Sequence, residues 1–277
     1  MTNNIQKPLV SIICFTYNHA LYIRNCLDGF INQQTNFLFE IIIHDDASTD
    51  GTTKIIYEYV KKYPRIIKPI IQKDNQYSIY GNFGVILNNC LNNCIGEYIA
   101  FCEGDDYWID PLKLQKQFNI LQSDKNIALS FHNAKVINLY NNEEKVFVKY
   151  LKEGKIPYWK LILLPWSTPT ASFFFRSSCL SGTKQPKDIN TDMFILYTCG
   201  IKGEIYFKNE LSSVYRFGTP GSASDTALKS SVIPIYKKKI ALMQYINRIT
   251  NNRFILITGI KVLWCRLKII KCKILGR

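Results

Sequence analysis

The chain has 277 residues and an apolar content of 47%, which is enough for one large hydrophobic core and excludes a disordered or fibrous protein. Its formal charge of +14 is unevenly distributed. Residues 229–277 contain twelve Lys or Arg and no Asp or Glu, so the rest of the chain carries a net charge of only +2. We therefore expect a nearly neutral main domain followed by a basic tail.

Cysteine, histidine and apolar patterns narrow the class of protein further. The nine cysteines include no Cys-x-x-Cys pair, and the three histidines have no ligand-like spacing, which argues against disulfides, structural zinc and a histidine metal site. Residues 1–8 lack the apolar segment of a signal peptide, and no run of about 18 uncharged apolar residues occurs. We expect a cytoplasmic protein without a membrane span.

The first half of the chain alternates between apolar strands and amphipathic helices. The predicted strands cover residues 9–15, 39–44, 66–72 and 98–102, and the predicted helices cover residues 23–31, 55–60 and 85–91. In the first helix, Ile23, Leu27 and Phe30 share one face. Successive strand-loop-helix units predict an α/β fold with a mostly parallel central sheet and flanking helices.

After Asp110 and Pro111, which begin a helix predicted to run to about residue 122, the pattern becomes less regular. The further expectations are a strand at 128–132, a hairpin of residues 136–140 and 145–148, an irregular segment at 157–169, a strand at 171–175, a helix at 188–199, and short strands at 205–207 and 214–215. We divide the chain into a domain at 1–228, with halves at 8–130 and 131–228, and a basic amphipathic helical tail at 229–277.

Three carboxylates, those of Glu103, Asp105 and Asp106, follow the predicted strand 98–102 directly. In open α/β sheets, ligands bind at the carboxyl ends of the strands. Carboxylates this close raise one another's pKa unless a cation lies among them, and Mg²⁺ or Mn²⁺ suits such ligands and shares its coordination with substrate phosphates. The alternative interpretation is a solvated acidic loop that caps the next helix.

Two more polar loops, at residues 16–18 and 45–48, are predicted to lie at the same edge of the sheet. Neither of the common glycine-rich phosphate loops, GxGxxG or GxxxxGK[ST], is present. A nucleotide bound here would need a metal ion for its phosphates and carboxylates for its base and ribose. The three loops supply these groups.

Three segments resemble the inverting family 2 glycosyltransferases of the GT-A fold. They read VSIICFTYN at 10–18, IHDDASTDGT at 43–52 and GEYIAFCEGDDYWID at 96–110, in the order and spacing of that family. The resemblance covers roughly residues 8–220 and implies a Rossmann-like GT-A domain. It further implies transfer of a sugar, with inversion, from a nucleotide-sugar donor, with UDP favoured, to a glycan or lipid-linked acceptor in bacterial surface polysaccharide synthesis.

On the donor side, the resemblance assigns roles to several residues. Asp46 matches the acid that reads the nucleobase, Tyr17 matches a residue near that base, and Asn82 lies where a polar side chain approaches the nucleotide. Arg216 matches a basic residue that approaches the diphosphate or the metal. Gly218 stands where the family frequently has His, so one metal or phosphate contact is missing.

The resemblance also implies a metal site and a base. Glu103, Asp105 and Asp106 match the region that binds the ribose and a Mn²⁺ or Mg²⁺ ion, and Asp105 is also expected to contact the donor. Asp192 matches the catalytic base, which must remove the proton of the acceptor hydroxyl as it attacks the anomeric carbon. Such a base contributes about 10²–10⁴ in rate.

The basic tail has an amphipathic pattern in which Leu263, Leu267, Ile270 and Ile274 share one helix face. We expect it to lie in the interface of an anionic membrane and to hold the enzyme on the inner face of the plasma membrane, near a lipid-linked acceptor. The alternative is that this apolar stripe packs on the main domain and the charges are solvated. Nucleic-acid binding is not expected, because no fold or basic aromatic patch supports it.

Two other functions compete with glycosyl transfer. Synthesis of sugar nucleotides would need a glycine- and lysine-rich phosphate loop near the first strand, which is absent. A catalytically degenerate sugar-binding or membrane-associated scaffold protein is consistent with the glycine at position 218, but the acids at 46, 105, 106 and 192 argue against it.

Overall fold

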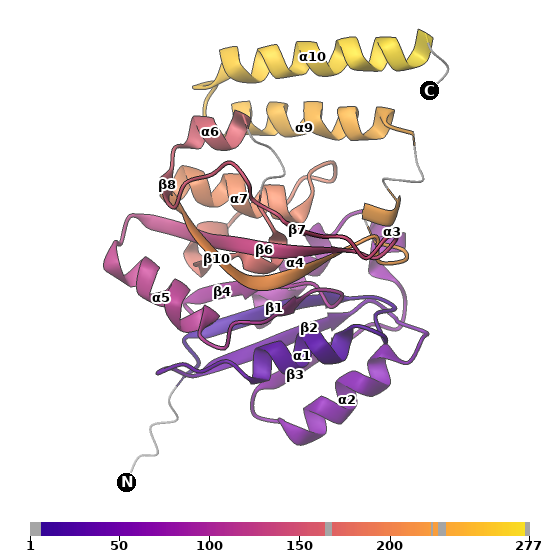
Figure 1. The fold of residues 1–277 in the computed structure, drawn as a ribbon, viewed down its shortest axis with the longest axis vertical. Coiled ribbons are helices and arrows are strands. Elements are labelled where there is room, and N and C mark those ends of the chain that lie inside the picture. The colour runs from indigo at the N-terminus through magenta and orange to yellow at the C-terminus, as the bar shows by residue number, and fades with distance from the viewer. Residues whose placement is uncertain (1–6, 164–167, 223, 227–230, 275–277) are drawn as a thin grey trace.

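The computed structural model describes residues 7–163, 168–222, 224–226 and 231–274. Within these residues the chain forms a ten-stranded mixed sheet with helices on both faces (Figure 1). The strands are β1 (Val10–Thr16), β2 (Phe39–Asp45), β3 (Ile67–Ile71), β4 (Tyr98–Phe101), β5 (Tyr107–Trp108), β6 (Ile127–Asn138), β7 (Glu144–Val146), β8 (Gly154–Ile156), β9 (Phe174–Arg176) and β10 (Glu204–Phe217). The helices are α1 (Ile23–Ile31), α2 (Thr52–Lys62), α3 (Gln76–Tyr80), α4 (Gly84–Asn93), α5 (Lys113–Ser123), α6 (Tyr158–Leu163), α7 (Thr191–Lys202), α9 (Ile233–Ile249) and α10 (Ile255–Ile274).

The first four strands form the predicted parallel sheet, in the order β3-β2-β1-β4. At its centre Ile13 of β1 lies opposite Ile42 of β2 and Phe101 of β4. Because the strands are parallel, the loops after β1, β2 and β4 leave the same edge of the sheet. This is the edge at which ligands bind in open α/β sheets.

Both faces of β1 are buried because its side chains alternate between two cores. Ile13 and Phe15 point toward the side covered by α4 and α7, whereas Ile12 and Cys14 point toward α1, α2 and α5. A continuous apolar sequence is therefore needed in this strand, as the prediction assumed.

Beyond β4 the sheet becomes mixed. β9 runs antiparallel to both β4 and β6, β6 is parallel to β10, and β5 and β8 are antiparallel to β10. The α/β class with flanking helices and C-terminal helices is confirmed, and parallel pairing is unbroken from β3 to β4 and recurs between β6 and β10.

Several local predictions for the second half were wrong in detail. The strands predicted at 128–132 and 136–140 are one strand, β6, and those predicted at 205–207 and 214–215 are one strand, β10. β6 and β10 pair along their length, with register shifts between Lys208 and Leu211 and between Leu211 and Ser213. The polar residues at these irregularities interrupt the apolar pattern without interrupting the strand.

Three predicted boundaries also differ from the structure. Residues 73–82, which separate the strand predicted at 66–72 from the helix predicted at 85–91, include the short helix α3, whose N-cap Asn75 accepts a hydrogen bond from the N–H of Ser78 at 2.6 Å. Residues 157–169 include α6, which buries Leu161 and Ile162. The helix predicted at 188–199 is α7, which begins three residues later, after the N-cap residue Asn190.

The predicted tail consists of two helices in different surroundings. α9 buries Leu242, Met243 and Ile246 in the same core as Phe194 and Tyr197 of α7. α10 lies outside α9, at the top of the molecule in Figure 1, and also contacts α6. No helix in the described part of the chain combines the length and hydropathy required to cross a membrane.

Candidate active site

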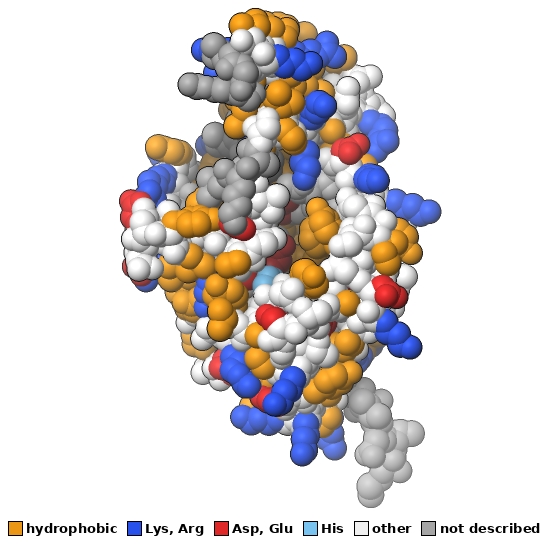
Figure 2. All heavy atoms as spheres, turned by 90° about the vertical axis from the view of Figure 1, so that its right-hand side faces the viewer, with side chains coloured by type: hydrophobic (Ala, Val, Ile, Leu, Met, Phe, Trp, Pro, Cys, Tyr) orange, Lys and Arg blue, Asp and Glu red, His pale blue; other side chains and the backbone are white. Residues whose placement is uncertain are grey.

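The loops after β1 and β2 are joined into one unit by hydrogen bonds. The N–H of Asn18 donates to Ser48 Oγ, and the N–H of Thr49 donates to Asn18 Oδ1, each at 2.8 Å. Asn18 has a φ of 55°, a left-handed conformation that asparagine tolerates better than most residues. Figure 2 shows the face at this side of the molecule, where acidic side chains and a histidine lie inside a hollow.

The acidic loop after β4 packs closely on this unit. The N–H of Gly104 donates to the carbonyl of Phe15 at 2.8 Å, and the N–H of His19 donates to Thr52 Oγ1 at 2.8 Å. A Cβ atom on Gly104 would lie 2.8 Å from Thr16 Oγ1 and 3.0 Å from His19 Nδ1. Glycine is required at 104 because the backbone there touches the end of β1.

Arg216 joins the end of β10 to the acidic loop. Its guanidinium donates to the carbonyl of Asp105, and its backbone N–H donates to Asp106 Oδ1 at 2.9 Å. The guanidinium also lies 4.4 Å from the ring centre of Tyr107 and 5.0 Å from that of Tyr22. The structure therefore brings Arg216 beside the acidic loop, while its contact with a diphosphate or a metal stays a prediction.

Uncompensated negative charge accumulates in the hollow. The carboxylate of Asp105 accepts no hydrogen bond from any described residue, although the residue as a whole is only 8% exposed. Burial, followed by the charges of Asp105 and Asp192, raises the pKa of Glu103 to about 8. Burial and the charge of Asp105 likewise raise the pKa of Asp106 well above its usual value. This crowding is the condition under which a bound cation is stabilising.

Asp192 is the second residue of α7, and its charge acts on Glu103 across the hollow. Burial raises the pKa of Asp192 to about 6, although backbone N–H groups at the start of the helix and the charge of Lys238 lower it. A carboxylate with this pKa is largely ionised at neutral pH and more basic than an exposed aspartate. Such a group can accept a proton from a hydroxyl.

The described residues do not assemble a complete protein metal site, because no group of three or more His, Cys, Asp or Glu among them has a suitable arrangement. A Mg²⁺ or Mn²⁺ ion that shares its coordination with phosphates needs only one or two protein carboxylates. The free carboxylate of Asp105 fits this role, whereas the backbone of Arg216 already occupies Asp106 Oδ1. The donor set therefore fits a cation that binds together with its substrate.

The three residues predicted around the nucleobase have different surroundings. Asp46 is buried, and its two carboxylate oxygens accept the N–H groups of Gln76 at 2.6 Å and Tyr77 at 3.0 Å, at the start of α3. Both ends of the Asn82 amide bond to backbone groups within its own turn. Tyr17 is 45% exposed. The nucleotide contacts of these residues stay predictions.

The sequence analysis missed His19, which the structure places beside the acidic loop. The Nδ1 atom of His19 is buried without a hydrogen-bond partner among the described residues. The charges of Asp105 and Arg216 both act on the imidazole, whose pKa burial lowers. Its position next to the motif residue Asn18 is the signal in the sequence that points to it.

Gly218, where the family frequently has His, has a structural reason to be glycine. Its φ of 88° is unfavourable for residues with a Cβ, and an added Cβ would lie 2.4 Å from the ring of Tyr140. A histidine at this position would need a different path for the chain after β10.

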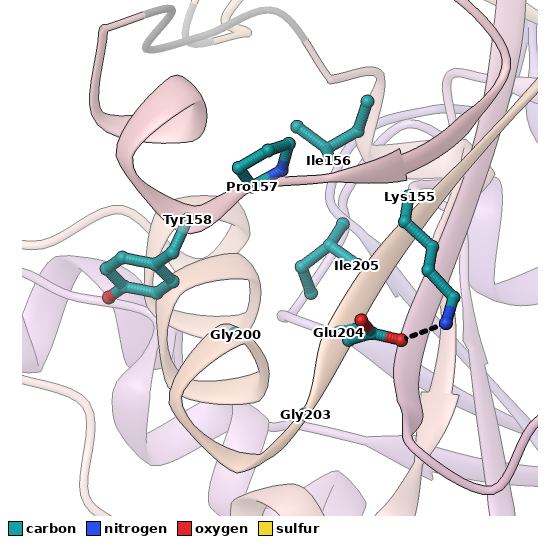
Figure 3. A pocket seen from close by; sticks show the side chains of 8 residues that line it. All are labelled: Lys155, Ile156, Pro157, Tyr158, Gly200, Gly203, Glu204 and Ile205. Carbon is teal, nitrogen blue, oxygen red and sulfur yellow. Dashed lines mark ion pairs between the residues drawn. The ribbon is translucent and has the colours of Figure 1, made fainter.

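A separate pocket, shown in Figure 3, lies at the other end of α7. It is lined by Lys155, Ile156, Pro157, Tyr158, Gly200, Gly203, Glu204 and Ile205. The ammonium of Lys155 is already paired with Glu204 at 2.5 Å and with Asp124 at 2.7 Å. By the helix rise of 1.5 Å per residue, this pocket is about 12–16 Å from Asp192 along α7, so it is not part of the acidic hollow.

Comparison with solved structures identifies the fold. The S. aureus protein TarS in complex with UDP aligns with a TM-score of 0.63 and 18% identity over 84% of this chain and 64% of that chain. The mannosyltransferase PcManGT from Pyrobaculum calidifontis, solved with GDP-Man and Mn²⁺, aligns with a TM-score of 0.61 and 14% identity over 99% of this chain and 77% of that one. These alignments confirm the predicted GT-A fold.

Sequence comparison gives relatives among bacterial proteins. The uncharacterized protein Rv1520 of Mycobacterium tuberculosis is 46% identical over 128 residues, which are 46% of this chain and 36% of that protein. TuaG of Bacillus subtilis, a glycosyltransferase assigned provisionally to teichuronic acid biosynthesis, is 35% identical over 131 residues, which are 47% of this chain and 48% of TuaG. The matched segments thus span between about a third and a half of these relatives.

The profile of Glycosyl transferase family 2 matches residues 11–180, more than half of the chain. The matched region contains the three joined loops with Glu103, Asp105 and Asp106, whereas Asp192 and Arg216 lie beyond it. The chain therefore belongs to glycosyl transferase family 2.

Proposed function

We propose that this protein transfers a sugar from a nucleotide-sugar donor, UDP-linked as the first expectation, to a hydroxyl of a glycan or lipid-linked acceptor, with inversion of the anomeric carbon. The observation that carries this proposal is the acidic loop at the carboxyl edge of the parallel sheet, where Arg216 bonds to the carbonyl of Asp105 and the charges of Asp105 and Asp192 both act on Glu103. TarS and PcManGT, solved with UDP and with GDP-Man and Mn²⁺, support a nucleotide donor for the same fold.

Asp105 is the proposed protein ligand of a Mn²⁺ or Mg²⁺ ion, with Glu103 and Asp106 nearby and Arg216 beside the diphosphate. When bound, the ion would stabilise the charge that develops on the departing nucleoside diphosphate. The other contributions to the reaction come from side chains of the protein. Arg216 contributes a second positive charge from the end of β10, and the carbonyl of Asp105 orients its guanidinium.

Asp192 is the proposed catalytic base. Its carboxylate would accept the proton of the acceptor hydroxyl while the hydroxyl oxygen bonds to the anomeric carbon and the bond to the diphosphate breaks. Attack from the side opposite the diphosphate inverts the anomeric centre. The raised pKa of Asp192, about 6, supports this assignment, because the group stays ionised at neutral pH and is a stronger base than an exposed aspartate.

Asp46, Tyr17 and Asn82 are proposed to surround the nucleobase and ribose. Because the carboxylate of Asp46 accepts two N–H groups from α3, base recognition would use its remaining lone pairs or move the segment 73–82. We further propose that the enzyme works in bacterial surface polysaccharide synthesis at the cytoplasmic face of the plasma membrane. The similarity to TuaG, a glycosyltransferase assigned provisionally to teichuronic acid biosynthesis, and the basic C-terminal helices support this placement.

A thermal-shift panel of UDP, GDP, dTDP and their sugar conjugates, each with Mn²⁺, Mg²⁺ or EDTA, tests the donor and the metal. A ligand at about 100 times its Kd adds roughly 2.7 kcal/mol to the free energy of unfolding. We expect one nucleotide to raise the Tm only with a divalent ion. If no nucleotide changes the Tm under any condition, the transferase proposal fails and a degenerate sugar-binding or scaffold protein is the better description.

A further inference from the structure

The outward face of α10 is aliphatic along its whole length. Six residues recur every three or four positions on this face: Leu256, Ile260, Leu263, Leu267, Ile270 and Ile274. Each of them is between 53% and 81% exposed. A helix on the surface of a folded protein normally presents charged and polar residues on this side.

The opposite face of α10 is fixed against the rest of the protein. Thr258 and Cys265 are buried, and the hydroxyl of Thr258 donates to Asn247 Oδ1 of α9 at 2.7 Å. The ammonium of Lys261 donates to the carbonyl of Leu163 in α6 at 2.9 Å. These contacts orient the aliphatic face away from the domain, so the predicted alternative, in which the stripe packs on the domain, does not hold.

Positive charges flank the aliphatic face. Arg266 and Lys273 lie on one side of it and Lys271 on the other, and residues 231–274 contain no Asp or Glu. The upper part of Figure 2 shows this combination of hydrophobic and basic side chains above the hollow. An aliphatic stripe bordered by lysine and arginine is typical of helices that lie in the interface of an anionic membrane.

We infer that α10 docks on an anionic lipid surface, with its aliphatic face inserted at the level of the headgroups and its flanking lysines and arginines on lipid phosphates. A second copy of this chain is a poorer partner, because its α10 would bring equal positive charge against positive charge. A membrane supplies both the apolar layer and the negative charge that this face lacks.

This docking also sets the position of the active site, a step that rests on the proposed function. α9 links α10 to α7: it packs on α7 through the core, and Lys238 Nζ approaches Asn190 Oδ1 at 3.4 Å, two residues before Asp192. The two helices thus connect the lipid-facing stripe to the helix that carries the proposed base. The acceptor class that suits this arrangement is a glycan on a membrane-embedded lipid.

Co-sedimentation of the full chain with vesicles of phosphatidylcholine, with and without phosphatidylglycerol, tests the inference. We expect binding to the anionic vesicles only, weakened by salt. The triple variant Leu263→Gln/Leu267→Gln/Ile270→Gln and the charge variant Arg266→Gln/Lys271→Gln/Lys273→Gln should each reduce the bound fraction at least tenfold. The matched control Leu21→Gln/Leu38→Gln/Leu112→Gln, at exposed leucines elsewhere, should bind like the wild type.

Two results would overturn the inference: the stripe variant sediments with anionic vesicles as the wild type does, or the wild type dimerises in light scattering through this face without binding lipid. All substituted side chains are at least partly exposed, so the variants should fold, and an unchanged Tm checks this. The nucleotide-induced thermal shift is measured on the same proteins. Loss of lipid binding with this shift intact separates failure of docking from failure of the proposed function.

Discussion

Replacing Asp105 by Asn should stabilise the free protein and abolish its stabilisation by nucleotide and metal. The substitution keeps the size of the side chain but removes one of the charges that crowd the hollow. After burial, the charge of Asp105 is the next largest cause of the raised pKa of Glu103. One pKa unit corresponds to about 1.4 kcal/mol, which sets the scale of the expected gain in the free energy of unfolding.

The gain should depend on pH with a defined sign. The pKa of Glu103 is about 8 in the folded protein, against an ordinary value of 4.5, so between these values the folded form retains a proton that the unfolded form loses. The stability of the wild type should therefore fall as the pH rises from about 4.5 to about 8. In the Asp105→Asn variant this loss should be smaller, and the two proteins should differ most near pH 8.

The assay is thermal unfolding of both proteins near pH 8, with and without nucleoside diphosphate and Mn²⁺. In a chain of this size 1 kcal/mol shifts the Tm by about 2–4 °C. The free variant should melt about 3–6 °C above the wild type. Nucleotide and metal at 100 times Kd add roughly 2.7 kcal/mol to the free energy of unfolding, so they should raise the Tm of the wild type by about 5–11 °C and leave the Tm of the variant unchanged. The exposed Asp188, changed to Asn, is the control. A variant that is less stable when free and still responds to nucleotide with metal would refute the reasoning.

Three further outcomes are expected. Asp192→Asn should lower the transfer rate by about 10²–10⁴ while nucleotide binding stays intact, and the control Asp188→Asn should leave the rate unchanged. In the wild type, kcat/KM should decrease at pH values below about 6 as Asp192 becomes protonated, and a flat pH profile would contradict its role as base. His19→Ala should weaken nucleoside diphosphate binding with Mn²⁺ in calorimetry, because its orphaned Nδ1 lies beside the acidic loop; unchanged affinity would make it structural. Lys113→Met should raise the Tm at neutral pH, since this ammonium is fully buried over Trp108 with its pKa lowered to about 7. The stability of the wild type should also rise from about pH 7 to 10.5, because in this range only the unfolded form still holds a proton on Lys113; the stability of the variant should lack this rise.

The parallel half of the sheet and its three loops could be predicted because the necessary information is local. The strands β1, β2 and β4 are predominantly apolar, and polar residues follow each apolar run where the strand ends. Parallel pairing then brings these loops to one edge without further information. The acidic residues, Arg216 and Asp192 were singled out through their resemblance to family motifs. In the structure Arg216 bonds to the acidic loop, and the charges of Asp105 and Asp192 both act on Glu103.

Tertiary structure decided the features that depend on distant partners. β6 and β10 continue through polar residues because each strand pairs with the other, and local hydrophobicity does not record such a pairing. His19 became a candidate site residue only when the backbone at Gly104 packed against it, and Asp46 acquired its two bonds only when α3 folded over it.

The sequence by itself determined that α10 has an aliphatic stripe and basic flanks, since both follow from the spacing of residues along one helix. It could not determine which face of α10 the protein would cover. That choice rests on contacts with α9 and α6, which bury Thr258 and Cys265 and leave the stripe outside. Periodicity specifies which residues share a face, but only packing decides whether that face meets protein or solvent.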